Sequence, residues 1–141
     1  MPKLLVFAPC RVGLVDQNNA LAVIGVFSEL VIDAPESHID ADAVVALHWD
    51  LVTQWFREPS EEQKQFVQHY ELVGPNRKVS LGSAKFSIPQ RLHQTVNSMN
   101  GFPVLGAGEY QLRLLLREDV EGAESREVAW FPIQVRFTQP G

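Results

Sequence analysis

The sequence predicts an all-β protein, a single antiparallel Greek-key β-sandwich of about eight strands. Apolar residues recur with the two-residue period of strands rather than with the period of helices. Turn-forming residues interrupt that pattern roughly every 8–15 residues, which is typical of antiparallel sandwiches. With 45% hydrophobic and 21% charged residues, and with no linker or repeat, the chain is expected to be one domain spanning residues 1–141.

Four strands are predicted in the first half of the chain. Asp16–Asn19 is rich in turn formers and predicts a hairpin between the first two strands. The first strand is expected to bend at Pro9 or Gly13, because Pro cannot donate to a central ladder. The charged connection 57–64 is expected to include one helical turn after Pro59. These strands cover residues 3–15, 20–32, 43–56 and 65–73.

The second half is predicted to add strands at residues 79–88, 91–99, 109–118 and 126–137, with a turn at Asn100 and Gly101. Tyr110 follows a Gly-rich turn at the start of a strand, which is typical of the tyrosine corner of an immunoglobulin-like sandwich. Its hydroxyl should bond to backbone a few residues upstream. Leu112 should then point inward, and Trp49 should lie in the core.

Charge and length bound the function classes. The net charge is −5 and the 12 basic residues are scattered, which disfavours nucleic acid and anionic membrane surfaces as partners. A basic partner suits this charge better. No apolar run reaches the roughly 18 residues of a membrane span, and the run after Lys3 is too short for a signal peptide. With Cys10 as its single cysteine, the protein is expected in the cytoplasm.

Catalytic templates such as G-x-S-x-G, a Walker loop or H-E-x-x-H are missing from the sequence, so we expect no enzyme and no cofactor. One constellation leaves a divalent metal open. If the strands carrying His48, Asp50, His69 and Glu71 pair as a hairpin, their side chains share one face and could hold Zn²⁺. The alternative interpretation is a solvated outer face, which alternation of polar and apolar residues also predicts.

Two acidic loops form a second candidate site. In a Greek-key scheme the loop after the second strand and the last hairpin loop emerge at the same end of the sandwich. Their carboxylates would then bind Ca²⁺ or a basic partner, or would simply be solvated. The candidate residues are Asp33, Asp40, Asp42, Glu118, Asp119 and Glu121.

The second strand suggests self-association. It is apolar on both alternating faces, with Ile24 and Val26 on one of them. An apolar outer face is usually covered, here by a second subunit in a homo-oligomer. A fully internal strand predicts the same pattern.

Three segments together resemble a bacterial domain family of unknown function. They are "DQNNALAVIGVFSEL", "HWDLVTQW" and "FPVLGAGEYQLRLLLRED…AWFPIQV". The resemblance implies a stand-alone β-sandwich of bacterial or phage origin and no catalytic residue. We therefore expect a non-catalytic module that binds another protein or itself. The alternatives are a metal-binding protein or metal-dependent enzyme, and a structural subunit of a larger particle.

Overall fold

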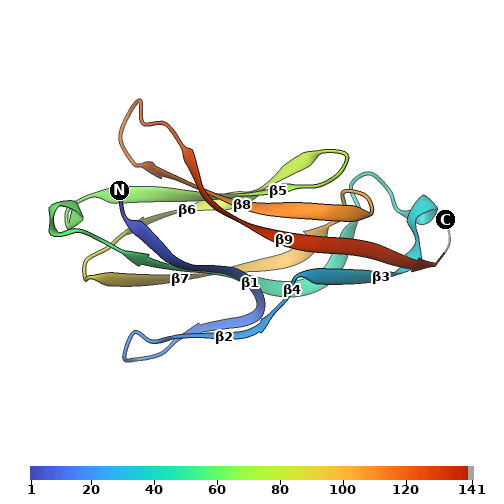
Figure 1. Ribbon diagram of the computed structural model, residues 1–141, viewed down its shortest axis with the longest axis horizontal. Helices are drawn as coiled ribbons and strands as arrows, with labels where there is room; N and C mark the ends of the chain where they lie inside the picture. The colour runs from blue at the N-terminus through green and yellow to red at the C-terminus, as the bar shows by residue number, and fades with distance from the viewer. Residues whose placement is uncertain (140–141) are drawn as a thin grey trace.

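The computed structural model describes residues 1–139, which form a β-sandwich of nine strands and two short 3₁₀ turns (Figure 1). One sheet has four strands in the order β2-β1-β4-β7, and the other has five in the order β3-β9-β8-β5-β6. The predicted all-β sandwich is confirmed. Within residues 1–139 no helix is long and apolar enough to cross a membrane. The elements are β1 (Lys3–Val15), β2 (Leu21–Val26), β3 (Glu29–Pro35), η1 (Glu36–His38), β4 (Val44–Phe56), η2 (Pro59–Glu61), β5 (Gln65–Val73), β6 (Lys78–Ser87), β7 (Leu92–Pro103), β8 (Gly108–Glu118) and β9 (Arg126–Gln139).

Alternate residues of β4, β5 and β8 fill the space between the sheets, because residues two apart on a strand share a face. Leu112 on β8 is fully buried, as the sequence predicts. Trp49 on β4 is also fully buried, and its indole N–H donates to the carbonyl of Gly101 at 2.8 Å. The core position of Trp49 is therefore confirmed, and its one polar group has a partner.

Tyr110 fixes the turn before β8. Its side chain is buried, its hydroxyl donates to the carbonyl of Gly106 at 2.5 Å, and it accepts the N–H of Leu105 at 2.6 Å. Burial raises the pKa of the Tyr110 hydroxyl, which therefore stays protonated and able to donate. The predicted bond to backbone upstream is confirmed.

A polar cluster bridges the two sheets inside the core. The side-chain oxygen of Gln68 on β5 accepts the indole N–H of Trp55 at 3.1 Å. Its amide nitrogen lies 2.8 Å from the Tyr70 hydroxyl and 2.9 Å from the hydroxyl of Thr95 on β7. Because a buried amide without partners costs free energy, these bonds favour one alignment of the sheets over others.

The apolar segment 20–32, expected to form one strand, is divided between the sheets. Its first part is β2, at the edge of the four-stranded sheet, and its second part is β3, at the edge of the five-stranded sheet. Phe27 lies at the crossing, where its ring meets that of Trp49 edge-on with centroids 5.8 Å apart. The Phe27 ring is buried between the sheets at this crossing, which favours the passage of the chain from one sheet to the other. The two-residue period of the sequence does not reveal such a crossing.

Two further features differ from the prediction, the direction of one strand and the position of one turn. β3 runs parallel to β9, with Leu30 opposite Val135, so the five-stranded sheet is mixed. The predicted turn at Asn100 and Gly101 lies inside β7. Gly101 has a φ of 94° there, and the register with β4 shifts nearby, so the dipeptide forms an irregularity within a strand instead of ending it.

Candidate functional site

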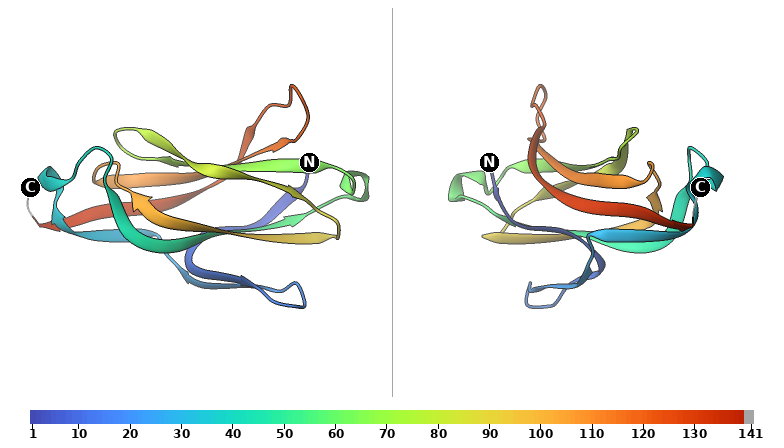
Figure 2. Two further views of the ribbon diagram at one scale, coloured as in Figure 1. Left: turned by 180° about the vertical axis from the view of Figure 1, so that it is seen from behind. Right: turned by 45° about the vertical axis from the view of Figure 1, so that its right-hand side comes forward.

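The β1–β2 hairpin is one edge of the four-stranded sheet and bends away from the sandwich (Figure 2). Its inner side packs on the outer face of β4 and β7. Residues of β1 up to Cys10 pair with β4, and those from Cys10 onward pair with β2. Gly13 comes so close to the sheet that a Cβ there would stand 2.4 Å from Cγ1 of Val52 and 3.3 Å from Cγ1 of Val96. Only glycine permits this approach, because it has no side chain.

Asp50 ties the hairpin to the sheet beneath it. Its carboxylate is 5% exposed and accepts the N–H of Gly13 and the hydroxyl of Ser98, each at 2.8 Å. These charge-assisted bonds compensate the burial of the carboxylate. Neither interpretation from the sequence, a metal ligand or a solvated face, describes Asp50. Its role here is to anchor a folded hairpin.

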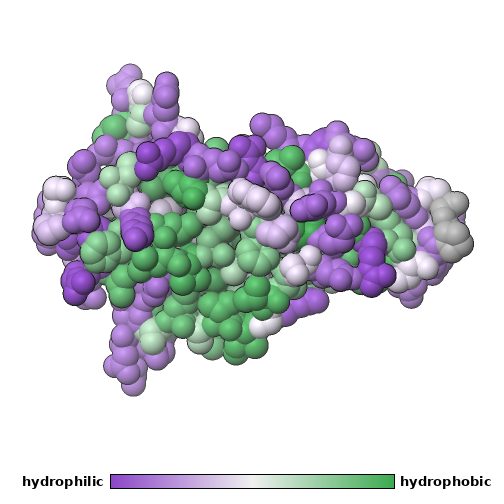
Figure 3. Space-filling model, in the orientation of Figure 1, coloured by the Kyte–Doolittle hydropathy of each residue, from purple (hydrophilic) through white to green (hydrophobic). Residues whose placement is uncertain are grey.

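The opposite face of the hairpin is exposed and apolar. Val12 pairs with Ile24, and Leu14 pairs with Ala22, so their side chains lie together on that face. Ile24 is 57% exposed and Val26 52%. Figure 3 shows apolar side chains gathered over this part of the molecule. We call Val12, Leu14, Ile24 and Val26 the hairpin face. The sequence had singled out Ile24 and Val26 for self-association, and both are exposed.

Sequence reasoning missed Val12 and Leu14. Both belong to the first strand, for which the sequence predicted only a bend at Pro9 or Gly13. Their alternation with Gly13 could have indicated this exposure. A glycine within a strand often marks a face on which another segment approaches the backbone closely. A glycine on one face and branched apolar residues on the other indicate close packing on the first face only.

The four candidate metal ligands do not come together. His48 and Asp50 are on β4, whose neighbours are β1 and β7, whereas His69 and Glu71 are on β5, whose neighbours are β6 and β8. The hairpin on which the metal-site interpretation depended does not form, since β4 and β5 belong to different sheets. The nearest approaches are within each strand, 3.7 Å from His48 Nε2 to Asp50 Oδ1 and 4.0 Å from His69 Nε2 to Glu71 Oε1. Among residues 1–139 no three His, Cys, Asp or Glu side chains are grouped to hold a metal.

The two acidic loops emerge at opposite ends of the sandwich (Figure 1). Asp33 accepts the hydroxyl of Thr138 at 2.8 Å, near the end of β9. Glu118 and Asp119 instead precede the turn that leads into the start of β9. β9 has 14 residues, so at roughly 3.3 Å per residue its ends are roughly 45 Å apart. The prediction of one acidic end is wrong, because β3 runs parallel to β9.

Several of these carboxylates have local partners. Hydrogen bonds from Thr138 and Gln139 lower the pKa of Asp33. Asp119 lies 3.4 Å from the ammonium of Lys85, and Glu118 lies 3.9 Å from that of Lys64. Such exposed pairs are worth little stability, but they reduce the negative potential of each loop. The other carboxylates of the predicted set, Asp40, Asp42 and Glu121, are exposed.

The thiol of Cys10 is buried at the point where β1 changes partners. Burial is the main cause that raises its pKa, with a smaller contribution from the charge of Asp50. A buried, protonated thiol is a poor nucleophile. Cys10 therefore serves as a small apolar side chain of the core.

Comparison with known proteins does not indicate a family for this chain. No protein-family model matches the chain, and no curated protein matches it either. The resemblance to a bacterial family of unknown function stays a prediction. The candidate site therefore depends on the geometry of the hairpin.

Proposed function

We propose that this chain is a binding and assembly module that associates with a second copy of itself through the hairpin face. One observation carries the proposal. Four branched apolar side chains, two on β1 and two on β2, are exposed on a hairpin that is itself held to the sandwich by Asp50 and Gly13. A rigid, exposed apolar face is what marks a protein interface.

Charge favours a second copy over a strongly basic partner at this face. Each copy carries a net charge of −5, so two copies repel unless they meet where carboxylates are missing. β2 has no charged residue, and Arg11 is the only charged residue within β1 from Cys10 onward. The guanidinium of Arg11 lies over the ring of Phe27 at 5.4 Å from its centroid. Contact through this face therefore brings no carboxylates together.

The strands at the sheet edges support the same choice. Natural edge strands discourage association with charged residues or proline. β3 has Glu29, Asp33 and Pro35, β6 has Lys78 and Lys85, and β7 has no Asp, Glu, Lys or Arg but ends at Pro103. β2 has neither a charged residue nor a proline. A two-fold arrangement, in which the same face of both copies meets, would cover the unprotected strand in each.

The test is sedimentation velocity of the protein over a wide range of concentration. We expect a dimer that dissociates on dilution, and Ile24→Lys should weaken it at least about 100-fold. A buried Ile side chain contributes roughly 1.5–3 kcal/mol, and a two-fold axis counts it twice. The matched control is Val44→Lys. Val44 is also on a strand of the four-stranded sheet and is 58% exposed, close to the 57% of Ile24.

Three results are informative. Loss of the dimer in Ile24→Lys but not in Val44→Lys supports the hairpin face. A native protein that stays monomeric at the highest concentration contradicts the proposal. Assembly into large particles that Ile24→Lys does not disturb also contradicts it and favours a structural subunit using another surface.

A further inference from the structure

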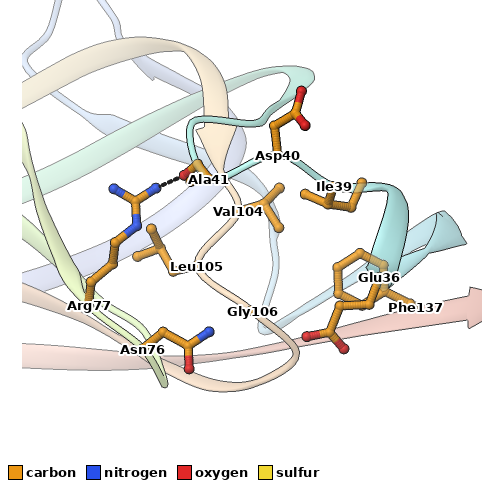
Figure 4. A pocket seen from close by; sticks show the side chains of 10 residues that line it. All are labelled: Glu36, Ile39, Asp40, Ala41, Asn76, Arg77, Val104, Leu105, Gly106 and Phe137. Atoms are coloured by element: carbon orange, nitrogen blue, oxygen red, sulfur yellow. Dashed lines mark hydrogen bonds between the residues drawn. The ribbon is translucent and has the colours of Figure 1, made fainter. Parts of the chain in front are cut away.

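Three connections meet at one end of the sandwich and enclose a cavity of about 310 Å³. They are the connection from η1 to β4, the turn between β5 and β6, and the connection from β7 to β8 (Figure 4). This end is remote from the tip of the hairpin (Figure 1). A cavity of this size lies at the lower limit of small-ligand pockets.

Polar and apolar side chains both line the cavity. Its lining includes Val104 and Leu105, which are buried, and Ile39 and Phe137, which are partly buried. The tyrosine corner fixes one wall, because the Tyr110 hydroxyl bonds both sides of the turn at Leu105 and Gly106. The cavity is therefore preformed and offers an apolar surface to a ligand.

Three charged side chains line the cavity, the basic Arg77 and the acidic Glu36 and Asp40. The carboxylate of Asp40 points away from the other two (Figure 4), which lie on different connections. Arg77, on the β5–β6 turn, donates from one guanidinium nitrogen to the carbonyl of Ala41, which leaves its other N–H groups for a ligand. Glu36, on η1, accepts the N–H of Ala107 at 3.4 Å through one oxygen. Figure 4 shows the two side chains on opposite sides of the cavity. Within residues 1–139 neither forms an ion pair.

The charges of Glu36 and Arg77 both act on the Tyr110 hydroxyl. Burial is the main reason that the pKa of Tyr110 is raised. The negative charge of Glu36 raises it further, and the positive charge of Arg77 lowers it. Both charges are therefore near enough to act on the wall of the cavity. The carboxamide of Asn76 lies on the same side of the cavity as Arg77 (Figure 4).

We propose that this cavity binds a short apolar peptide with free ends, of about the size of a dipeptide. Arg77 binds the carboxylate, since a guanidinium matches a carboxylate with two parallel hydrogen bonds. Glu36 binds the ammonium at the other end. The apolar side chains of the peptide lie against Leu105 and Phe137. A single amino acid is a poorer ligand, because its two charges are adjacent while Arg77 and Glu36 lie on opposite sides of the cavity (Figure 4).

Calorimetric titration with L-alanyl-L-leucine tests the proposal, with N-acetyl-L-alanyl-L-leucinamide as the matched uncharged probe. We expect binding of the free dipeptide and at least tenfold weaker binding of the blocked one. Arg77→Gln and Glu36→Gln should each weaken the free dipeptide about tenfold, which is the usual effect of losing a hydrogen bond to a charged group. The control variants Lys78→Gln and Glu109→Gln change neighbouring exposed charges outside the cavity and should bind as the native protein does.

Amide chemical shifts locate the site independently of affinity. On addition of the dipeptide, the amides of Leu105, Gly106 and Ala107 should shift, while those of Val23 and Ile24 on the hairpin should not. Melting temperatures of the variants show that each one is folded. No heat and no shift at millimolar dipeptide overturns the proposal. Equal binding of the blocked probe, or unchanged binding by both Arg77→Gln and Glu36→Gln, overturns it as well.

Discussion

β2 and β3 come from one continuous apolar segment, yet they have opposite surroundings. β3 buries Leu30 and Ile32 against the core, whereas no residue of β2 is buried and Ile24 is 57% exposed. Both strands are at the edge of a sheet. The difference lies in what each strand covers. β3 closes the space between the sheets, and β2 lies on a hairpin outside it.

The comparison shows that the sequence determines how many apolar side chains of a strand have to be buried. The tertiary structure determines which part of the protein, or which partner, buries them. For β3 the cover is intramolecular, through pairing with β9. For the outward face of β2, residues 1–139 supply none. The proposed dimer gives β2 the kind of burial that β3 already has. Three measurements test this comparison.

The largest expected effect is the difference between Leu30→Ala and Ile24→Ala. Leu30 is 7% exposed, so its truncation should lower the free energy of unfolding by about 2–4 kcal/mol. Ile24→Ala should lower it by less than about 1 kcal/mol in dilute, monomeric protein. Urea unfolding at low concentration measures both. A large loss in Ile24→Ala under those conditions would show that β2 is covered within the monomer.

Asp50→Ala should have the next largest effect and should act on the hairpin. It leaves the N–H of Gly13 and the hydroxyl of Ser98 without their acceptor, which costs about 2 kcal/mol. Hydrogen exchange should show faster exchange in β1 beyond Cys10 and in β2, with β3 unchanged. Asp42→Ala removes an exposed carboxylate and is the matched control. Uniform acceleration across both β2 and β3 would mean that the hairpin is no separate unit.

The smallest expected effect is a pH dependence at the strand beneath the hairpin tip. Asn19 contacts β7 at Leu92, next to His93. Burial lowers the pKa of His93, so the unfolded chain binds a proton there more readily than the folded protein does. The contribution of His93 to the free energy of unfolding is therefore full above the pKa of the unfolded chain, about 6.5. It is lost as the pH falls from there toward the lower pKa of the folded protein.

Unfolding by urea at pH 7.5 and pH 5.5 measures that loss. His93→Phe should reduce the difference between the two pH values, because Phe keeps the ring that stacks on Phe86 and cannot be protonated. His38→Gln, at an exposed histidine on η1, is the control and should leave the difference unchanged. An unchanged difference in His93→Phe would assign the acid sensitivity to other groups.

Local patterns predicted the parts of the fold that depend on local geometry. Tyr110 and Leu112 could be placed because a tyrosine corner and a two-residue period involve neighbours in the sequence. The crossing at Phe27 could not be placed in this way, because it depends on a ring contact with Trp49 in another strand. The parallel pairing of β3 with β9 is likewise set by distant residues.

The candidate site follows the same division. Ile24 and Val26 were found because apolar residues on both faces of a strand call for an explanation. Asp50 was misassigned because its partner Gly13 is 37 residues away. The acidic loops were placed at one end on the assumption of antiparallel strands. Once β3 is parallel to β9, the loop after β3 lies at the opposite end from the loop before β9.

The pairing of β3 with β9 also sets an order of events during synthesis. Glu29 pairs with Gln134, so all the intervening strands must be synthesised before β3 has a neighbour. Until then Leu30 and Ile32 have no strand to protect them, which is a period of exposure to aggregation. Truncation before β9 would leave β3 without its neighbour, whereas β2 would keep its pairing with β1. β9 is therefore the strand whose arrival allows β3 to join a sheet.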